Sequence, residues 1–204
     1  LKKDNYIQKI KSLKQLPDLV EKTIMSQNKI KDLKALPELI EKTLLHDNDI
    51  QAISSTFNEA KGSMFLGRGF SYPIALEGAL KLKELSYLHA EGYPAGEMKH
   101  GPLALIEEGL PVIVIAPKDK YYEKTLSNMQ EVIARGGKIL FISDHKKELI
   151  NENVRFGVTV PFLDNLLSPI LLTIPIQLLA YHVALLKGCD IDKPRNLAKS
   201  VTVE

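Results

Sequence analysis

Cysteine is almost missing from this sequence, because Cys189 is the only one in 204 residues. A single thiol excludes an internal disulfide framework and any metal site that needs several cysteines. This usage suits a reducing compartment, so we expect a cytoplasmic protein. No residue pattern indicates a metal site or a bound cofactor.

The sequence also lacks a strong charge of one sign and a long unbroken apolar run. Its 27 basic and 25 acidic side chains give a formal charge of +2, and they form no cluster of the kind that binds nucleic acid. The longest apolar run, at about 169–180, is interrupted by Pro175 and Gln177, and no signal sequence opens the chain. We therefore expect neither nucleic acid nor a membrane as a partner.

The first quarter of the chain contains a duplication. The stretch KSLKQLPDLVEKT at 11–23 returns as KDLKALPELIEKT at 31–43. Two units are too few for a solenoid, but their apolar residues have helical spacing. Pro17 and Pro37 suit the first turn of a helix. We expect residues 1–59 to be a helical segment of two amphipathic units, which either packs on the core or docks on a neighbour.

From about residue 60, short apolar runs alternate with helical patterns. The runs typical of buried parallel strands are 63–67, 111–117, 138–143 and 154–160. The helical patterns cover about 73–90, 119–135 and 166–187. Strands separated by helices imply right-handed crossovers, so we predict a three-layer α/β/α domain with a mostly parallel sheet over 60–204.

The first predicted strand ends at Gly67-Arg68-Gly69, and a helix follows directly. Ligands of such sheets bind beyond the carboxyl ends of the strands. We therefore expect the amino-terminal part of this helix to face a ligand crevice.

The same helix carries a charged stripe in the stretch EGALKLKE. Glu77, Lys81 and Glu84 have the spacing i, i+4, i+7 and share one face. The plain interpretation is a solvated ladder of ion pairs. The alternative is an active site, because a carboxylate beside a lysine can move a proton between adjacent carbons of a sugar.

Two further residues fit the second interpretation. His100 precedes the backbone break Gly101-Pro102, and Lys199 lies in the polar tail RNLAKSVTVE. Taken singly, each has a plain explanation, as a structural histidine and as a solvated terminal lysine. Taken together, a histidine that titrates near neutrality could open a sugar ring, and a lysine could form an imine with an open-chain ketose.

Three motifs resemble one enzyme family in order and approximate spacing: EGALKLKE, GE-x-KHGPLAL and PRNLAKSVTVE. The family is glutamine:fructose-6-phosphate aminotransferase (isomerizing), and the resemblance runs from about residue 35 to the last residue. It implies that 60–204 is the second of two sugar isomerase (SIS) domains. In that family, fructose 6-phosphate reacts with ammonia from a glutaminase domain, and the product isomerises to glucosamine 6-phosphate.

The resemblance also implies roles for the candidate residues. Glu84 looks like the base that shuttles the proton, and Lys199 looks like the lysine that forms the imine. His100 looks like the ring-opening histidine, supplied to the other subunit of a homodimer. Glu77 and Lys81 look like a supporting pair that sets charge and protonation.

The chain departs from the family in what it does not contain. The amino-terminal nucleophilic cysteine, the glutaminase domain and the serine- and threonine-rich phosphate loop of the first SIS domain have no counterpart. Arg68 is the evident candidate to hold a phosphate. We therefore expect the first SIS and glutaminase domains upstream of Leu1, and a chain that is catalytically incomplete alone.

Two other interpretations remain open. The chain could be a non-catalytic SIS module that binds a sugar phosphate for regulation, or an assembly piece that works through its duplicated helices. The position of Lys199 relative to Glu84 distinguishes them from the catalytic interpretation.

Overall fold

The computed structural model describes residues 27–145, 154 and 156–197. The chain divides into two compact units, residues 1–38 and 39–204. Helix α3 (Gln27–Leu44) crosses this boundary, and all later elements belong to the second unit. These later elements are α4 (Asp47–Ser54), η1 (Ser55–Phe57), β1 (Gly62–Gly67), α5 (Ser71–Ser86), β2 (His89–Pro94), η2 (Ala95–His100), η3 (Pro102–Leu105), β3 (Pro111–Ile115), α6 (Tyr122–Ile133), β4 (Lys138–Ser143), β5 (Phe156–Thr159) and α7 (Ser168–Leu186).

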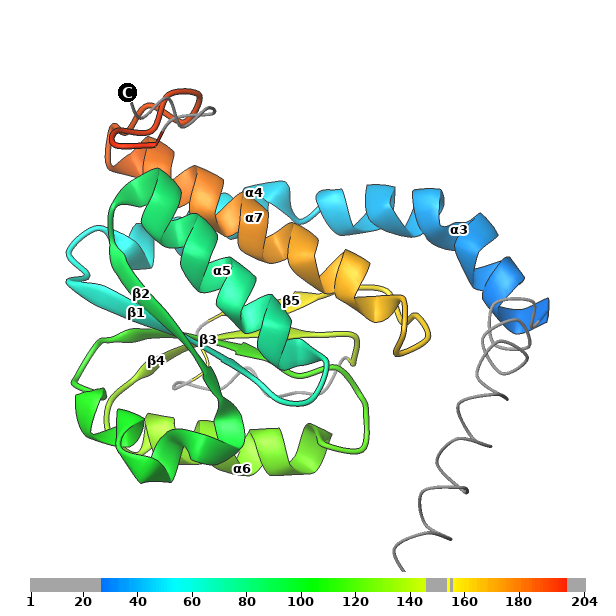
Figure 1. Ribbon diagram of the computed structural model, residues 1–204, viewed down its shortest axis with the longest axis horizontal. Coiled ribbons are helices and arrows are strands. Elements are labelled where there is room, and N and C mark those ends of the chain that lie inside the picture. Colours follow the sequence, from blue (N-terminus) through cyan, green and yellow to red (C-terminus); the bar gives the residue numbers. More distant parts are fainter. Residues whose placement is uncertain (1–26, 146–153, 155, 198–204) are drawn as a thin grey trace, which may run out of the picture. The chain divides into compact units, whose positions relative to one another are not determined.

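The five strands form one sheet in the order β2-β1-β3-β4-β5, and every neighbouring pair is parallel. Helices α4, α5 and α7 cover one face, and α6 covers the other (Figure 1). The predicted three-layer α/β/α architecture is therefore confirmed, with a sheet that is parallel throughout.

The central strands are buried on both faces, which is why they read as continuous apolar runs. Every residue of β3 is buried, as are all but the first of β1 and of β4. Between the sheet and α6, the side chains of Leu66, Val114 and Ile139 pack with Met129 and Val132. This packing fixes the positions of the strand ends, from which the loops project.

The strand order contains a switch point between β1 and β3. From β1 the chain first moves outward to β2 and then returns to β3 on the other side of β1. The loops after β1 and β3 thus diverge and leave a crevice at their carboxyl ends.

Two details of the sequence prediction are wrong. The helix expected over 73–90 ends at Ser86, because Tyr87 adopts a left-handed conformation (φ 58°), and β2 then begins at His89. This edge strand, HAEGYP, has no apolar run to reveal it.

The helical segment also differs from the expectation at Pro37. This proline lies inside α3, ten residues after its start, and not in a first turn. There it deprives the carbonyl of Leu33 of a helical donor. The first copy of the duplication, with Pro17, lies outside the described residues.

Helix α7 is long and apolar enough, by length and composition, to cross a membrane. Half of this apolar stretch is buried inside the fold, and the helix packs on α4 and α5. It is the core helix of this domain.

Candidate active site

The charged stripe lies along the middle and the carboxyl-terminal half of α5. Lys81 Nζ lies 2.7 Å from Glu84 Oε2 and 4.0 Å from Glu77 Oε1. Each of the three side chains keeps about a third of its surface exposed (35%, 33% and 30% from Glu77 to Glu84). The group is therefore one connected set of charges, partly shielded but open to a ligand.

The contact with Glu84 stabilises the protonated form of Lys81. The hydrogen bond that Lys81 donates to Glu84 raises the pKa of the ammonium above its usual value of 10.5, and the charges of Glu84 and Glu77 add to this against the opposing effect of burial. Lys81 thus stays a cation at neutral pH, which suits charge stabilisation and makes it a poor nucleophile.

Lys81 and Glu84 line a cleft of about 730 Å³ together with the segment that follows α7. That segment contributes Ile191, Asp192, Lys193, Pro194 and Leu197. It turns over the end of α5 because α7 stops before Gly188 (φ +67°) and Asp190 Oδ1 accepts the backbone N–H groups of the second and third residues after it.

Lys199 itself lies outside the described residues. The last described residue, Leu197, stands two positions before it and lines the cleft that contains Glu84. The structure thus brings the start of the terminal motif to the stripe.

His100 is not brought to this cleft within the chain. It ends η2, 75% of its side chain is exposed, and Nε2 lies 3.9 Å from Glu97 Oε2. Glu84 precedes the start of β2, whereas His100 follows its end, and the strand alone spans about 17 Å. Within the chain, His100 and Glu84 therefore lie at opposite ends of β2.

Arg68 marks a second, separate cavity at the switch point. Its guanidinium lies 5.5 Å from the centre of the Tyr121 ring, beside a cavity of about 520 Å³. This cavity is lined by Gly69, Phe70, Asp119, Lys120, Tyr121 and Asn165.

Arg68 and Glu84 lie near opposite ends of α5. Glu84 lies thirteen residues beyond Ser71, which is about 20 Å along the helix at 1.5 Å per residue. The carboxyl-end rule therefore identifies a crevice, but not the one that contains Glu84.

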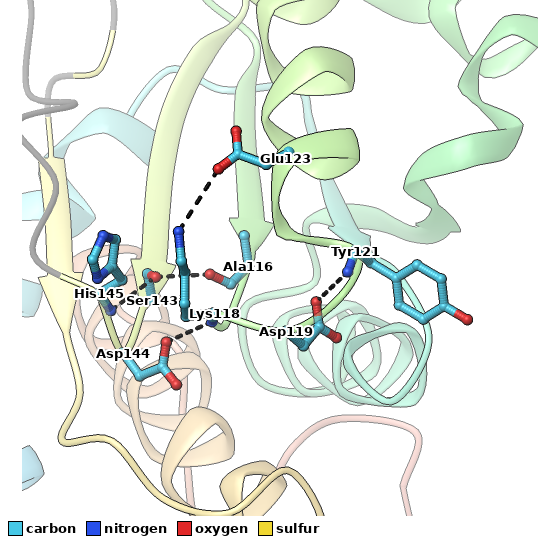
Figure 2. A network of polar contacts seen from close by, with 8 residues as sticks. All are labelled: Ala116, Lys118, Asp119, Tyr121, Glu123, Ser143, Asp144 and His145. Carbon is cyan, nitrogen blue, oxygen red and sulfur yellow. Dashed lines mark hydrogen bonds and ion pairs between the residues drawn. The ribbon is translucent and has the colours of Figure 1, made fainter.

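Hydrogen bonds hold the loops at the carboxyl ends of β3 and β4, as Figure 2 shows. Asp144 Oδ1 accepts the backbone N–H of Lys118 (2.7 Å), and Ser143 Oγ donates to the carbonyl of Ala116 (2.7 Å). Burial raises the pKa of Asp144. Sequence reasoning missed these residues, because isolated polar side chains after strands carry no motif.

Among residues 27–145, 154 and 156–197, no group of three His, Cys, Asp or Glu side chains is arranged to hold a metal ion.

The fold and its site can be compared with known proteins. The SIS domain profile matches residues 56–187, and the chain belongs to this family.

Among curated relatives, the chain is 59% identical over 156 residues to glutamine--fructose-6-phosphate aminotransferase [isomerizing] of Agrobacterium fabrum and 54% identical to that of Rhizobium meliloti. Each match covers 76% of this chain and 26% of the relative, so the chain spans about a quarter of their length.

A solved structure gives the same result in three dimensions. The C-terminal domain of glucosamine-fructose-6-phosphate aminotransferase from Francisella tularensis superposes with a TM-score of 0.78 at 44% identity, over 84% of this chain and 50% of that one. The fold alone recurs in a putative phosphosugar isomerase from Bacillus subtilis, with a TM-score of 0.68 at 17% identity, over 82% of this chain and 50% of that one.

Proposed function

We propose that this chain is the carboxyl-terminal part of a glutamine:fructose-6-phosphate aminotransferase. The complete enzyme would convert fructose 6-phosphate to glucosamine 6-phosphate with ammonia from glutamine. Residues 60–204 would be its second SIS domain, and 1–59 the helical segment before it. The first SIS domain and the glutaminase domain would lie upstream, so this chain alone would not turn over substrate.

One observation carries the proposal more than any other. The carboxylate of Glu84 is held at 2.7 Å by the ammonium of Lys81, in a cleft that the segment leading to Lys199 also lines. Identities of 54–59% to the aminotransferases over this region support the same assignment.

The arrangement suggests a separate chemical role for each of four side chains. Glu84 would take a proton from one carbon of the open-chain sugar and return it to the adjacent carbon. Lys199 would first form an imine with the carbonyl of the open-chain sugar, with loss of water. Ammonia would then displace the lysine amine and leave its own imine, whose adjacent C–H is acidic. Lys81, a cation at neutral pH, would stabilise the negative charge that develops between these steps, and Glu77 would set its orientation.

The exposed His100 suits a role in trans. We propose that two chains associate and that His100 of each opens the sugar ring in the other's active site. A cytoplasmic location fits the single cysteine and the phosphorylated substrate. Because Arg68 lies about 20 Å along α5 from Glu84, the upstream SIS domain would bind the sugar phosphate.

Replacing the base tests the central assignment. In the complete enzyme, Glu84→Gln should lower the rate of glucosamine 6-phosphate formation by about 10²–10⁴-fold. Lys83→Gln, one residue earlier on the exposed side of α5, should leave this rate near wild type. Equal rates for Glu84→Gln and wild type would refute the base assignment and favour a binding module without catalysis.

The imine has its own test. Borohydride should trap a sugar adduct on Lys199, and Lys199→Arg should abolish the trapping because a guanidinium forms no stable imine. An adduct that persists in Lys199→Arg would assign the imine to another lysine.

Complementation tests the dimer. Chains with His100→Ala and chains with Glu84→Gln should each be inactive, and coexpression should restore part of the activity through mixed dimers. Mixed dimers that stay inactive would place the histidine in its own subunit's site.

A further inference from the structure

The residue that ends α5, Tyr87, has an unusual backbone. Its φ of 58° and ψ of 13° are left-handed, a region that glycine occupies without strain and bulky side chains rarely adopt. Asparagine would also fit this backbone better than tyrosine. The helix end alone therefore does not explain why a tyrosine stands here, and its side chain has to be considered.

The side chain of Tyr87 contacts the carboxyl-terminal segment at two points. The backbone N–H of Arg195 donates a 2.8 Å hydrogen bond to Tyr87 Oη. The guanidinium carbon of Arg195 lies 4.1 Å from the centre of the Tyr87 ring, a cation–π distance. One residue at the end of α5 thus holds both the main chain and the side chain of a residue 108 positions later.

This contact lies between two of the proposed functional residues. Tyr87 follows Glu84 by three positions, and Arg195 precedes Lys199 by four. Four residues of chain span at most about 14 Å, so the position of Arg195 limits how far from the end of α5 the chain at Lys199 can lie. Without the contact, the direction of the segment would depend on its turn at Asp190 and on the Cys189 thiol, which donates to the carbonyl of Ser86 at 3.9 Å.

We propose that Tyr87 is a positioning residue, which holds the terminal segment at Arg195, beside the Glu84 cleft, and so orients the chain that leads to Lys199. The inference rests on the proposed function for the role of Lys199, but the contact itself does not. The role assigned to Tyr87 involves no contact with substrate or reacting atoms. It acts by limiting where the lysine can go, and such orientation can account for a large share of a rate.

Three substitutions at Tyr87 separate the contributions. Tyr87→Phe keeps the ring and removes only the acceptor oxygen. Tyr87→Leu removes both contacts. Tyr87→Asn also removes both contacts, but asparagine adopts the left-handed backbone with less strain. An effect that Tyr87→Leu and Tyr87→Asn share therefore reflects the position of the terminal segment and not the stability of the helix end. Tyr181→Phe on α7 is the matched control, because it removes a phenol oxygen from a half-exposed tyrosine that lies outside both the segment and the lining of the Glu84 cleft.

Steady-state kinetics of the complete enzyme give the first readout. For Tyr87→Leu and Tyr87→Asn, we expect kcat to fall roughly ten- to a hundredfold with little change in KM for fructose 6-phosphate. The kcat of Tyr87→Phe should lie between the values of these two variants and that of wild type. The rate of borohydride trapping at Lys199 should fall in the same order. Tyr181→Phe should behave as wild type in both assays. Wild-type kcat in both Tyr87→Leu and Tyr87→Asn would overturn the proposal.

A second readout does not depend on the chemistry. Tryptic cleavage after Lys199 in the folded enzyme should be several-fold faster in Tyr87→Leu and Tyr87→Asn than in wild type or Tyr181→Phe. If wild-type enzyme traps no adduct on Lys199, the imine role fails, and faster cleavage in the variants still establishes the contact. Unchanged cleavage in Tyr87→Leu and Tyr87→Asn refutes the positioning role whatever the imine assay shows.

Discussion

The close approach of α5 to the sheet at Gly78 gives a prediction in which two known effects oppose each other. Gly78 lies in the middle of α5, inside the motif that carries the charged stripe. Alanine stabilises a helix interior over glycine by about 1 kcal/mol. Helix propensity alone therefore predicts that Gly78→Ala makes the protein more stable.

Packing predicts the opposite result. A Cβ at Gly78 would lie 2.6 Å from both Cδ1 and Cε1 of Phe65, and 3.2 Å from Cδ1 of Ile176. Phe65 and Ile176 are fully buried, so the ring has no free space into which to retreat by the roughly 0.8 Å that separates 2.6 Å from an ordinary 3.4 Å contact. Overpacking of this kind costs about 1–3 kcal/mol. Because contacts of 2.6 Å lie well below the 3.0 Å that real Cβ atoms keep, we place this cost in the upper part of the range, at about 2–3 kcal/mol. After subtraction of the propensity gain of about 1 kcal/mol, we expect Gly78→Ala to lose about 1–2 kcal/mol.

Urea unfolding followed by circular dichroism measures the loss, and a double-mutant cycle identifies its cause. Phe65→Leu alone should destabilise by leaving a cavity. Combined with Gly78→Ala, it should cost less than the sum of the two single changes by about 1 kcal/mol, because the smaller side chain makes room for the methyl group. Gly62→Ala is the control in β1, since its Cβ meets only an ordinary 3.4 Å contact. A Gly78→Ala protein as stable as wild type, or additive free energies in the cycle, would refute the close-packing argument.

Three further predictions concern pH. The pKa of Lys81 is raised in the folded state, so its contribution to stability is complete below pH 10.5 and is lost as the pH rises through the folded pKa. In unfolding measurements, Lys81→Gln should therefore lose less stability at alkaline pH than wild type. An unchanged dependence of stability on pH would contradict this prediction. The hydrogen bond to Glu91, with burial, raises the pKa of Tyr93 to about 12, so its share of stability should decline from pH 10 to 12. Burial raises the pKa of Tyr122 as well, so absorbance titration should show late tyrosinate absorbance that shrinks by one tyrosine in Tyr93→Phe, and a late amplitude unchanged in that variant would assign it elsewhere. Burial raises the pKa of Asp144, so folding disfavours its charged form. Asp144→Asn keeps an acceptor for the Lys118 N–H and should be more stable than wild type at pH 7, and this advantage should disappear as the pH falls below 3.8. A stability difference that does not depend on pH would exclude a charge effect.

The fold could be predicted from the sequence to the extent that burial leaves a pattern. Strands β1, β3 and β4 are buried on both faces, so each is an apolar run that a reader can find. Strand β2 is an edge strand of mixed residues, and its existence depends on pairing with β1. The end of α5 depends on the left-handed Tyr87, a conformation that tertiary contacts impose on a residue with no preference for it.

The candidate site divides in the same way. Helical spacing was sufficient to place Glu77, Lys81 and Glu84 together, because residues three and four apart on a helix are neighbours in any fold. The location of their cleft was not accessible from the sequence. The strand rule pointed to the loop at Arg68, and the cleft lies at the far end of the same helix, where the segment after α7 turns back.

What the sequence determined by itself was local: the period of the buried strands and of the helices, the charged face of one helix and the short motifs of neighbouring residues. These depend on residues within a few turns of one another, and the backbone geometry of helices and strands translates them directly into position. What only the tertiary structure decided was which distant segments meet, as when Arg195 settles on Tyr87 beside the Glu84 cleft. Such contacts form because whole layers of helices and strands pack together, and because this packing holds residues such as Tyr87 in a strained backbone conformation. The residue pattern of neither contacting segment alone predicts them.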